Sequence, residues 1–282
     1  MGPVRRYELS EEQFAEISDL LPTSGRRGGQ WKDHRQILNG IFWILHTGAQ
    51  WRELPERYGN WKTVYDRFRR WQRDGTLDRI LQRLQMRLDE EGRIDFDLWC
   101  VDATPIRASR AAGGGGKKPS PDEPADHALG RSRGGFGTKL HLVTDGNGIP
   151  LQVLASAGQR HDCLFAEPIL KATQVRCANR SWRSRPRQVA GDKGYSYPAV
   201  RRYLRRRRIQ PIIPTRKNQP VDPKFDRQTY RRRNVVERCV GWLKENRRLG
   251  TRHEKLAVTF TAMAKWAIAR RYFRILDSSD RT

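Results

Sequence analysis

Three acidic residues stand at points in the sequence where a carboxylate could bind a metal ion. Asp102 ends an apolar run that begins at Phe96, and Asp192 follows a second short apolar run, inside a Gly-Asp-Lys-Gly-Tyr turn. Glu237 lies in the strongly basic segment Tyr230–Arg238. Carboxylates hold Mg²⁺ together with waters and substrate phosphates. Two such ions about 4 Å apart can serve the attacking and the leaving oxygen of a phosphodiester displacement.

Each of these carboxylates also has a purely structural interpretation. Asp102 could cap a turn before the Thr-Pro pair that follows it, Asp192 could stabilise its own glycine turn, and Glu237 could pair with a neighbouring arginine. Taken singly, the structural interpretation is the commoner one. Taken together in a strongly basic chain, the three acids favour a metal site.

The charge of the chain indicates a polyanionic partner. The 282 residues contain 56 Lys and Arg against 31 Asp and Glu, a net charge of +25, and residues 180–282 alone carry +21. Arginine makes up 44 of these cations, and its guanidinium matches phosphate geometry. Nucleic acid is therefore the first partner to expect and an anionic membrane surface the second. Nine Trp, nine Phe and eight Tyr supply a core, which argues against disorder.

Several classes of protein are disfavoured. No apolar run approaches the roughly 18 residues of a membrane-spanning helix, and the first residues lack the apolar stretch of a signal peptide. The four cysteines are scattered, which supports neither a disulfide framework nor a zinc cluster. We therefore expect a reduced, cytoplasmic protein with no membrane partner.

The central and C-terminal residues, 93–276, predict a mixed α/β sheet domain that positions these acids. A Gly-rich and Pro-rich stretch at 111–135 predicts a flexible surface insertion, and residues 277–282 form a tail. An Asp-Gly-Asn-Gly turn at 145–148 predicts a hairpin. The expected strands are 96–102, 138–144, 149–156, 188–190 and 209–213, and the expected helices are 162–173 and 198–207.

Residues 1–92 predict a helical region. The pattern indicates a helix capped by Ser10 and further helices over Asp33–His46, Trp61–Asp74 and Leu77–Leu88. A short glycine turn before the basic, aromatic third helix suggests a helix-turn-helix DNA reader. In that case Lys62, Arg69 and Arg70 contact phosphates. A plain helical bundle with a solvated basic face fits the pattern equally well.

The basic C-terminal third places further cations near Glu237. At about 100° per residue, a continuous helix brings Tyr230, Arg233, Lys244 and Arg248 within roughly 40° of Glu237. One face would then carry a carboxylate among phosphate-binding groups. The run 201–208, with Arg205 and Arg206, predicts a second contact with DNA backbone; its alternative is a solvated helix face.

The spacing Tyr230-x2-Arg233-x3-Glu237-x6-Lys244 resembles the Y-x2-R-x3-E-x6-K signature of bacterial insertion-sequence DDE transposases, the IS-four/IS-five superfamily. Asp102 in Val-Asp-Ala-Thr resembles the first catalytic aspartate of that family, and Asp192 resembles the second. The resemblance covers about residues 5–275, because the N-terminal region also looks like the DNA-binding region of the IS-five branch.

This resemblance implies an RNase H-like catalytic domain, preceded by an all-α, helix-turn-helix-like DNA-binding region. Asp102, Asp192 and Glu237 would be catalytic ligands of two Mg²⁺ ions, with Mn²⁺ as a substitute, and Tyr230, Arg233 and Lys244 would contact terminal DNA phosphates.

The partners implied are double-stranded DNA, as transposon ends and as target, and further copies of the protein on that DNA. The protein would be nucleoid-associated in a bacterial cytoplasm. The spacing of 45 positions from Asp192 to Glu237 leaves no room for the β-rich insertion of some relatives.

The activity implied is binding of terminal inverted repeats, cleavage at 3′ ends and strand transfer. Two alternatives stay open at this point. One is a catalytically idle, transposase-derived DNA-binding regulator, which Mg²⁺-dependent nicking would exclude. The other is an RNase H-like nuclease without joining activity, which a strand-transfer assay separates from a transposase.

Overall fold

A computed structural model describes residues 7–23, 31–115, 122–223 and 225–277. The predicted tail beyond Asp277, and residues 116–121 of the predicted insertion, lie outside the described residues.

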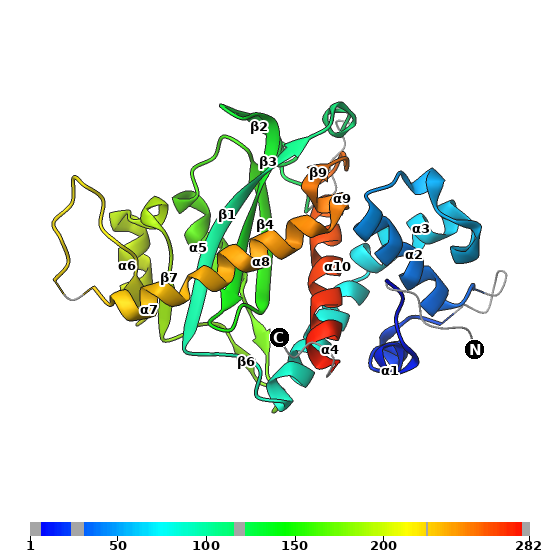
Figure 1. Cartoon of the computed structure of the whole chain (residues 1–282), viewed down its shortest axis with the longest axis horizontal. Coiled ribbons are helices and arrows are strands. Elements are labelled where there is room, and N and C mark those ends of the chain that lie inside the picture. The colour runs from blue at the N-terminus through cyan, green and yellow to red at the C-terminus, as the bar shows by residue number, and fades with distance from the viewer. Residues whose placement is uncertain (1–6, 24–30, 116–121, 224, 278–282) are drawn as a thin grey trace.

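The helices and strands of the described chain are shown in Figure 1. The α-helices are α1 Glu11–Ala15, α2 His34–Thr47, α3 Trp61–Arg73, α4 Thr76–Glu90, α5 Cys163–Ala172, α6 Pro198–Arg206, α7 Arg227–Arg232, α8 Asn234–Glu245, α9 Arg247–Gly250 and α10 Ala257–Leu276. The strands are β1 Leu98–Ala108, β2 Gly130–Ser132, β3 Gly135–Asp145, β4 Pro150–Ala157, β5 Val175–Arg176, β6 Trp182–Arg183, β7 Gln188–Ala190, β8 Gln210–Ile212 and β9 Thr251–Arg252.

The N-terminal helices form where the sequence predicts them. The Ser10 side chain accepts from the backbone N–H of Gln13, which closes a capping box on α1. Asn60 caps α3 through the backbone N–H of Lys62, at 2.9 Å. The predicted short glycine turn between α2 and α3 is wrong, because two 3-10 turns, Trp51–Glu53 and Glu56–Tyr58, fill that connection. A DNA-reading role for these helices stays a prediction.

The main sheet confirms the predicted mixed α/β fold. Its strands lie in the order β4-β3-β1-β7-β8, with β2 also paired to β3 and β9 to β1. Strands β4, β3 and β1 are antiparallel neighbours, whereas β1, β7 and β8 are parallel. Counting these five strands along the chain, the spatial order is third, second, first, fourth, fifth. This is the RNase H-like arrangement.

Strand β1 is longer than the sequence suggests, and this corrects the position of Asp102. The apolar run 96–102 indicated that the strand stops at Asp102, but β1 continues to Ala108. It can continue because β3 pairs with it along the whole stretch from Trp99 to Arg107. Asp102 therefore lies in the middle of the central strand rather than at its end.

Helix α10 joins the N-terminal helices to the sheet. It packs against α4, α2 and β4, as Figure 1 shows for its place between the sheet and α2. Trp266 is fully buried there, with its ring centroid 5.9 Å from those of Phe42 and Trp71. Burying such large rings is a major source of folding free energy. The two regions thus share one core, and the proposed boundary at residue 92 stays a prediction.

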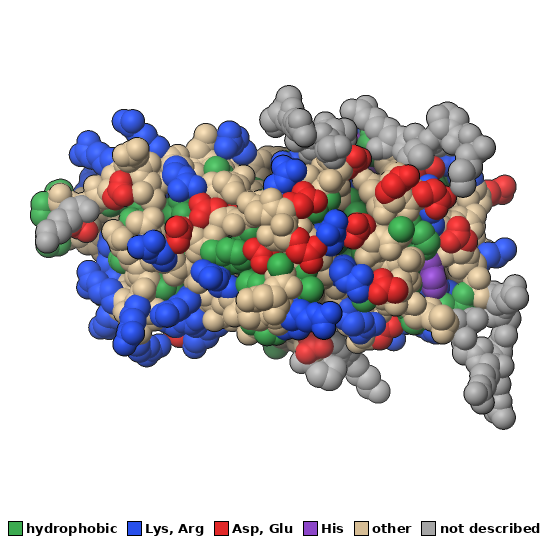
Figure 2. Space-filling view, turned by 90° about the horizontal axis from the view of Figure 1, so that it is seen from below, with side chains coloured by type: hydrophobic (Ala, Val, Ile, Leu, Met, Phe, Trp, Pro, Cys, Tyr) green, Lys and Arg blue, Asp and Glu red, His purple; other side chains and the backbone are tan. Residues whose placement is uncertain are grey.

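Charge is uneven over the surface. In Figure 2, which views the molecule from the lower side of Figure 1, Lys and Arg side chains gather at the end that carries α6 and α7. Acidic and basic side chains are mixed over the other half. Within the described residues, no helix is long and apolar enough to cross a membrane.

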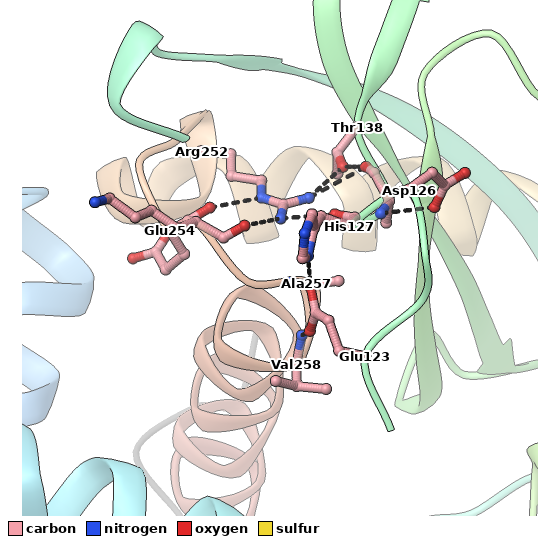
Figure 3. A network of polar contacts seen from close by, with 10 residues as sticks. Glu123, Asp126, His127, Thr138, Arg252, Glu254, Ala257 and Val258 are labelled. Atoms are coloured by element: carbon pink, nitrogen blue, oxygen red, sulfur yellow. Dashed lines mark hydrogen bonds and ion pairs between the residues drawn. The ribbon is translucent and has the colours of Figure 1, made fainter. Parts of the chain in front are cut away.

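Part of the predicted flexible insertion is anchored to the core through residues 123–128, so the prediction of flexibility is wrong for that stretch. Figure 3 shows the contacts. The buried Glu123 carboxylate accepts from the backbone N–H groups of Ala257 and Val258, at 2.6 and 2.9 Å, at the first turn of α10. The fully buried Arg252 donates to the backbone carbonyls of His127 and Ala128. The Glu123 carboxylate thus binds the N-terminus of α10, and the Arg252 guanidinium binds several carbonyls at once. Together these contacts hold residues 123–128 in place.

Candidate active site

Asp102 lies beside a gap in the pairing of β1. Strand β7 pairs with β1 only over Leu98–Cys100, and β9 pairs only with Arg107 and Ala108. Between these two contacts β1 is paired on one side alone, by β3. Pro105, which cannot donate a ladder hydrogen bond, lies in this unpaired stretch, as expected for a strand edge. The Asp102 side chain is 23% exposed there.

Asp192 follows β7 at the same level of the sheet. Leu98 is opposite Gln188 and Cys100 is opposite Ala190, so the same register extended by two residues brings Asp102 level with Asp192. The Asp192 carboxylate accepts from the backbone N–H of Gly194 at 2.8 Å. A Cβ at Gly194 would stand 2.8 Å from that carboxylate oxygen. The glycine therefore permits the tight turn that orients Asp192.

Glu237 comes from α8, which packs across β1 and β3. Val236, Cys239 and Leu243 are buried on the sheet side of α8, whereas the Glu237 side chain is 50% exposed. The predicted continuous helix is divided at Arg233 into α7 and α8, although Arg233 keeps a helical backbone, with φ −55° and ψ −23°.

The Arg233 guanidinium lies between two of the three acids. One of its nitrogens is 3.6 Å from Asp102 Oδ2, and the other donates to Glu237 Oε1. Its side chain is only 13% exposed. The sequence assigned Arg233 to a DNA phosphate; within the protein alone it neutralises the carboxylates.

The charges of the other two acids act on Asp102. Burial raises the pKa of Asp102, while the Ala103 backbone N–H and the Arg233 guanidinium lower it. The negative charges of Asp192 and Glu237 raise it further. The net effect is a raised pKa, so the folded chain holds a carboxylate at some cost in free energy. A bound cation would relieve that cost.

The donor chemistry of this cluster fits a divalent metal. Asp and Glu oxygens are the ligands that Mg²⁺ and Mn²⁺ favour. Over the described residues, however, no three His, Cys, Asp or Glu side chains are grouped closely enough to hold an ion. The exposed Glu237 and the intervening Arg233 are the groups that must move before all three acids can share one.

The other signature residues lie along the same pair of helices. The Tyr230 ring is half-buried, with the Arg233 guanidinium carbon 5.7 Å from its centroid. Lys244 is exposed near the C-terminal end of α8, two turns beyond Glu237. The phosphate contacts of both residues stay predictions.

The structure contradicts the predicted position of Arg248 on the DNA-binding face. The helical-wheel argument put it on the DNA face, but α8 ends at Glu245, and Arg248 belongs to α9. Its side chain is buried, donates to Glu254 Oε1 at 2.6 Å and to the backbone carbonyl of Ala49 at 2.9 Å. It joins the catalytic domain to α2 rather than binding phosphate.

We predict that Arg248→Met lowers the free energy of unfolding by about 3 kcal/mol, because it leaves the buried Glu254 carboxylate without its partner. Urea denaturation would measure this. The salt dependence of DNA binding should stay that of the wild type. If the variant instead showed a weaker salt dependence of DNA binding and an unchanged free energy of unfolding, Arg248 would be a DNA contact after all.

The remaining predicted DNA contacts lie away from the acids. Lys62 and Arg70 are exposed on α3, whereas Arg69 is half-buried and donates to the Tyr65 hydroxyl at 3.4 Å. Arg70 also lies 5.0 Å from the centroid of the Trp31 ring. Arg205 and Arg206 are exposed at the end of α6.

Asp162 is a further acid near the site, and the His161-Asp162 pair is a weaker candidate in the sequence for the edge of that site. It pairs with Lys139 at 2.8 Å. Its charge, like those of Asp102 and Asp192, raises the pKa of the buried Tyr195, after the larger effect of burial itself. Asp162 comes shortly after β4 and just before α5, so its place at the end of a strand connection was the available signal.

Two family models match the chain. Residues 9–81 match the family described as putative transposase of IS4/5 family (DUF4096), and residues 95–271 match the family described as transposase DDE domain. The second match includes Asp102, Asp192 and Glu237.

Curated relatives are similar over part of the chain. The putative transposase for insertion sequence element IS402 of Burkholderia cepacia is 35% identical over 130 residues, covering 46% of this chain and 59% of that protein. The uncharacterized 16.2 kDa protein of the same element is 35% identical over 107 residues, covering 36% of this chain and 73% of that protein. The uncharacterized protein y4sN of Sinorhizobium fredii is 33% identical over 118 residues, covering 39% of this chain and 89% of that protein.

Solved structures of the Mos1 transposase are more distant. Its paired-end complex with the left transposon end has a TM-score of 0.24 and 11% identity, covering 80% of this chain and 82% of that one. Its mariner paired-end complex with Mn has a TM-score of 0.25 and 12% identity, covering 84% of this chain and 86% of that one. The assignment of an RNase H-like fold therefore depends on the strand order of the sheet and not on these structures.

Proposed function

The chain belongs to the transposase DDE domain family, and from this premise we propose that it cleaves the 3′ ends of its own insertion sequence and joins them to target DNA. It is a polynucleotidyl transferase of the IS4/IS5 type. Recognition of terminal inverted repeats, dependence on Mg²⁺ and a two-metal mechanism belong to the proposal.

One observation supports this proposal most strongly. Asp102 on β1 comes level with Asp192, which follows the neighbouring parallel strand β7, and Glu237 on α8 is near enough for its charge to raise the pKa of Asp102. A structural role for each acid alone would not require that convergence, which places unfavourable negative charges together. Acids held close at such a cost are characteristic of a site that takes up cations.

Asp102, Asp192 and Glu237 would hold the divalent ions. When bound, the metal supplies an activated oxygen nucleophile and neutralises the charge that builds up on the phosphate. The protein's own contribution is position: the Gly194 N–H fixes the Asp192 carboxylate, and α8 presents Glu237 over the sheet.

The cations of the signature would hold the DNA. Lys244 would place a point charge on a terminal phosphate, and Arg233 would fork onto another once released from Asp102 and Glu237. Tyr230 would donate a hydrogen bond or stack on a base. The N-terminal helices would bind the repeat, and a multimer would pair the two ends.

The test is a strand-transfer assay. A duplex carrying the DNA that flanks this gene is incubated with a supercoiled target plasmid, the wild-type protein and Mg²⁺. We expect nicks at the 3′ ends and covalent joining to the plasmid, both abolished when the metal is chelated and both abolished in Asp192→Asn. Undiminished activity in that variant would refute the metal assignment.

The same assay separates the alternatives. Specific binding of the flanking duplex without nicking would identify a DNA-binding regulator. Nicking without joining would identify a nuclease.

A further inference from the structure

A second arginine surface lies apart from the carboxylates. Two segments, residues 180–187 and 202–208, place exposed arginines at the start of β7 and β8. These are Arg180, Arg183, Arg185, Arg187, Arg202, Arg205, Arg206 and Arg208. In the sequence from 168 to 221 the only acid is Asp192. We call this set the arginine exosite.

Hydrogen bonds to backbone carbonyls hold the two segments together. Arg207 donates to the carbonyl of Ser184 at 3.0 Å, and Arg185 donates to the carbonyl of Arg207 at 2.9 Å. The backbone N–H of Gln210 donates to the carbonyl of Arg187 at 2.8 Å. The exosite is therefore a built surface in which residues distant along the chain keep a fixed arrangement.

Several of its cations are not neutralised by the protein. Over the described residues, Arg202, Arg205 and Arg208 have no carboxylate within ion-pair distance, while Arg206 is 3.8 Å from Glu167 and Arg187 is 3.9 Å from Asp97. Like charges crowded together destabilise the folded chain unless an anion neutralises them. The geometry thus points to an external polyanion.

The backbone at Arg208 supports the same conclusion. Arg208 follows α6 with φ 55°, and Ile209 donates to the carbonyl of Leu204, as in the helix-ending motif that favours glycine. A side chain in this left-handed conformation is less stable than glycine, which has no Cβ to clash with the backbone. Arginine at position 208 therefore lowers the stability of the folded chain relative to glycine, while it adds a positive charge to the exosite.

The exosite lies at the opposite end of β7 from the active site. Arg187 precedes β7 and Asp192 follows it, and four residues from Gln188 to Asp192 at about 3.3 Å per residue span roughly 13 Å. Because β1 and β7 are parallel, the exosite faces the lower side of Figure 1, where Figure 2 shows blue side chains at the α6 end. A phosphate bound here is not one at the cleavage site.

We propose that the arginine exosite binds the phosphate backbone of double-stranded DNA at a distance from the cleaved bond, adding affinity without reading sequence. The proposal rests on the proposed function for the identity of the partner. Guanidinium groups fork onto phosphates and remain charged at any physiological pH. A membrane surface fits less well, because among the described exposed large hydrophobics only Trp182 belongs to these segments, and membrane-binding surfaces need an apolar face.

The experiment compares two triple variants of equal charge in a catalytically inactive background. Arg202→Gln, Arg205→Gln and Arg208→Gln are introduced into the Asp192→Asn protein. The control carries Arg110→Gln, Arg131→Gln and Arg133→Gln, three exposed arginines near the far end of β1 and on β2. Binding of a fluorescent random-sequence duplex of about 30 base pairs is followed by anisotropy over a range of KCl, with metal chelated.

We expect the exosite variant to bind more weakly and its slope of log K against log salt to become shallower by about 2 to 3, because each phosphate that the protein no longer neutralises lowers the slope by close to 0.9. The control should keep the wild-type slope. Equal changes in the two variants would show that affinity follows net charge alone and would overturn the proposal. So would tighter binding to phosphatidylserine vesicles than to the duplex.

A second measurement does not depend on the variants folding. Phenylglyoxal modifies exposed arginines, and mass spectrometry of the Asp192→Asn protein should show that saturating duplex protects Arg202, Arg205 and Arg208 but not Arg131 and Arg133. Equal protection would contradict the exosite. Failure of strand transfer in the wild type would refute the proposed function and leave both of these binding results unaffected.

Discussion

Replacing Asp102 by asparagine is expected to reduce Mg²⁺-dependent cleavage and joining by about 10³-fold or more. A metal contributes several kcal/mol of charge stabilisation, and each 1.36 kcal/mol is tenfold in rate. Asparagine keeps the size of the side chain but removes the charge that draws a cation. Single-turnover rates of nicking on a flanking-sequence duplex would measure the reduction.

The same substitution is expected to leave the metal-free protein as stable as the wild type, or more stable. Burial, foremost, raises the pKa of Asp102, so the folded state favours the protonated form. A raised carboxyl pKa contributes stability below its unfolded value of about 4, and that stability disappears as the pH rises through the folded pKa. At neutral pH the ionised carboxylate is therefore a cost that asparagine removes.

Thermal unfolding with and without Mn²⁺ would measure this second effect. The wild type should be stabilised by the ion and the variant much less, because binding to the folded state alone raises stability. Asp97→Asn is the matched control, since Asp97 precedes β1 on the same chain segment and is 65% exposed. Full activity of Asp102→Asn would contradict its role as a metal ligand. A large fall in the metal-free melting temperature of this variant would mean that Asp102 has a structural role.

Replacing Arg252 by methionine is expected to lower the free energy of unfolding by about 3–5 kcal/mol. Arg252 is fully buried, and its guanidinium donates to Thr138 Oγ1 at 2.7 Å and to the backbone carbonyls of residues 127, 128, 254 and 255. Methionine fills much of the volume but satisfies none of these acceptors. Burial lowers the pKa of Arg252 to about 10, which still leaves it charged at neutral pH.

Urea denaturation would measure this destabilisation. Arg107→Met is the matched control, because Arg107 lies on β1 next to β9 and is exposed. It should change stability by no more than about 0.5 kcal/mol. A destabilisation below about 1 kcal/mol for Arg252→Met would show that the segment 122–129 is held by other contacts, such as that of Glu123 with α10.

The residues that the sequence placed well are those whose position follows from local rules. Asp192 could be located because an apolar run ends in a glycine turn, and the turn also explains its hydrogen bond to Gly194. The parallel register that brings Asp102 level with Asp192 depends on strand order, which local spacing does not encode. The residues alone favoured one metal site for the three acids, but they did not show which neighbouring strands bring Asp102 and Asp192 level.

The errors have a common physical origin in tertiary contacts. Arg248 lies on the predicted helical face only if the helix continues, and α8 ends before it. Residues 122–135 have the composition of a flexible loop, yet Glu123 is buried because α10, more than 130 residues later, offers it two backbone N–H groups. Neither partner is visible in a short window of sequence.

The place of α10 has a consequence for the order in which the protein can fold. The helices α2, α3 and α4 are made before the sheet, but Phe42 and Trp71 pack against Trp266, which the ribosome adds only after all the strands of the sheet. At roughly 5–20 residues per second, the interval between α4 and α10 is about 10–35 s. During this interval the apolar surface around Phe42 and Trp71 is not covered by α10. The N-terminal helices therefore complete their native packing only after the sheet has been translated.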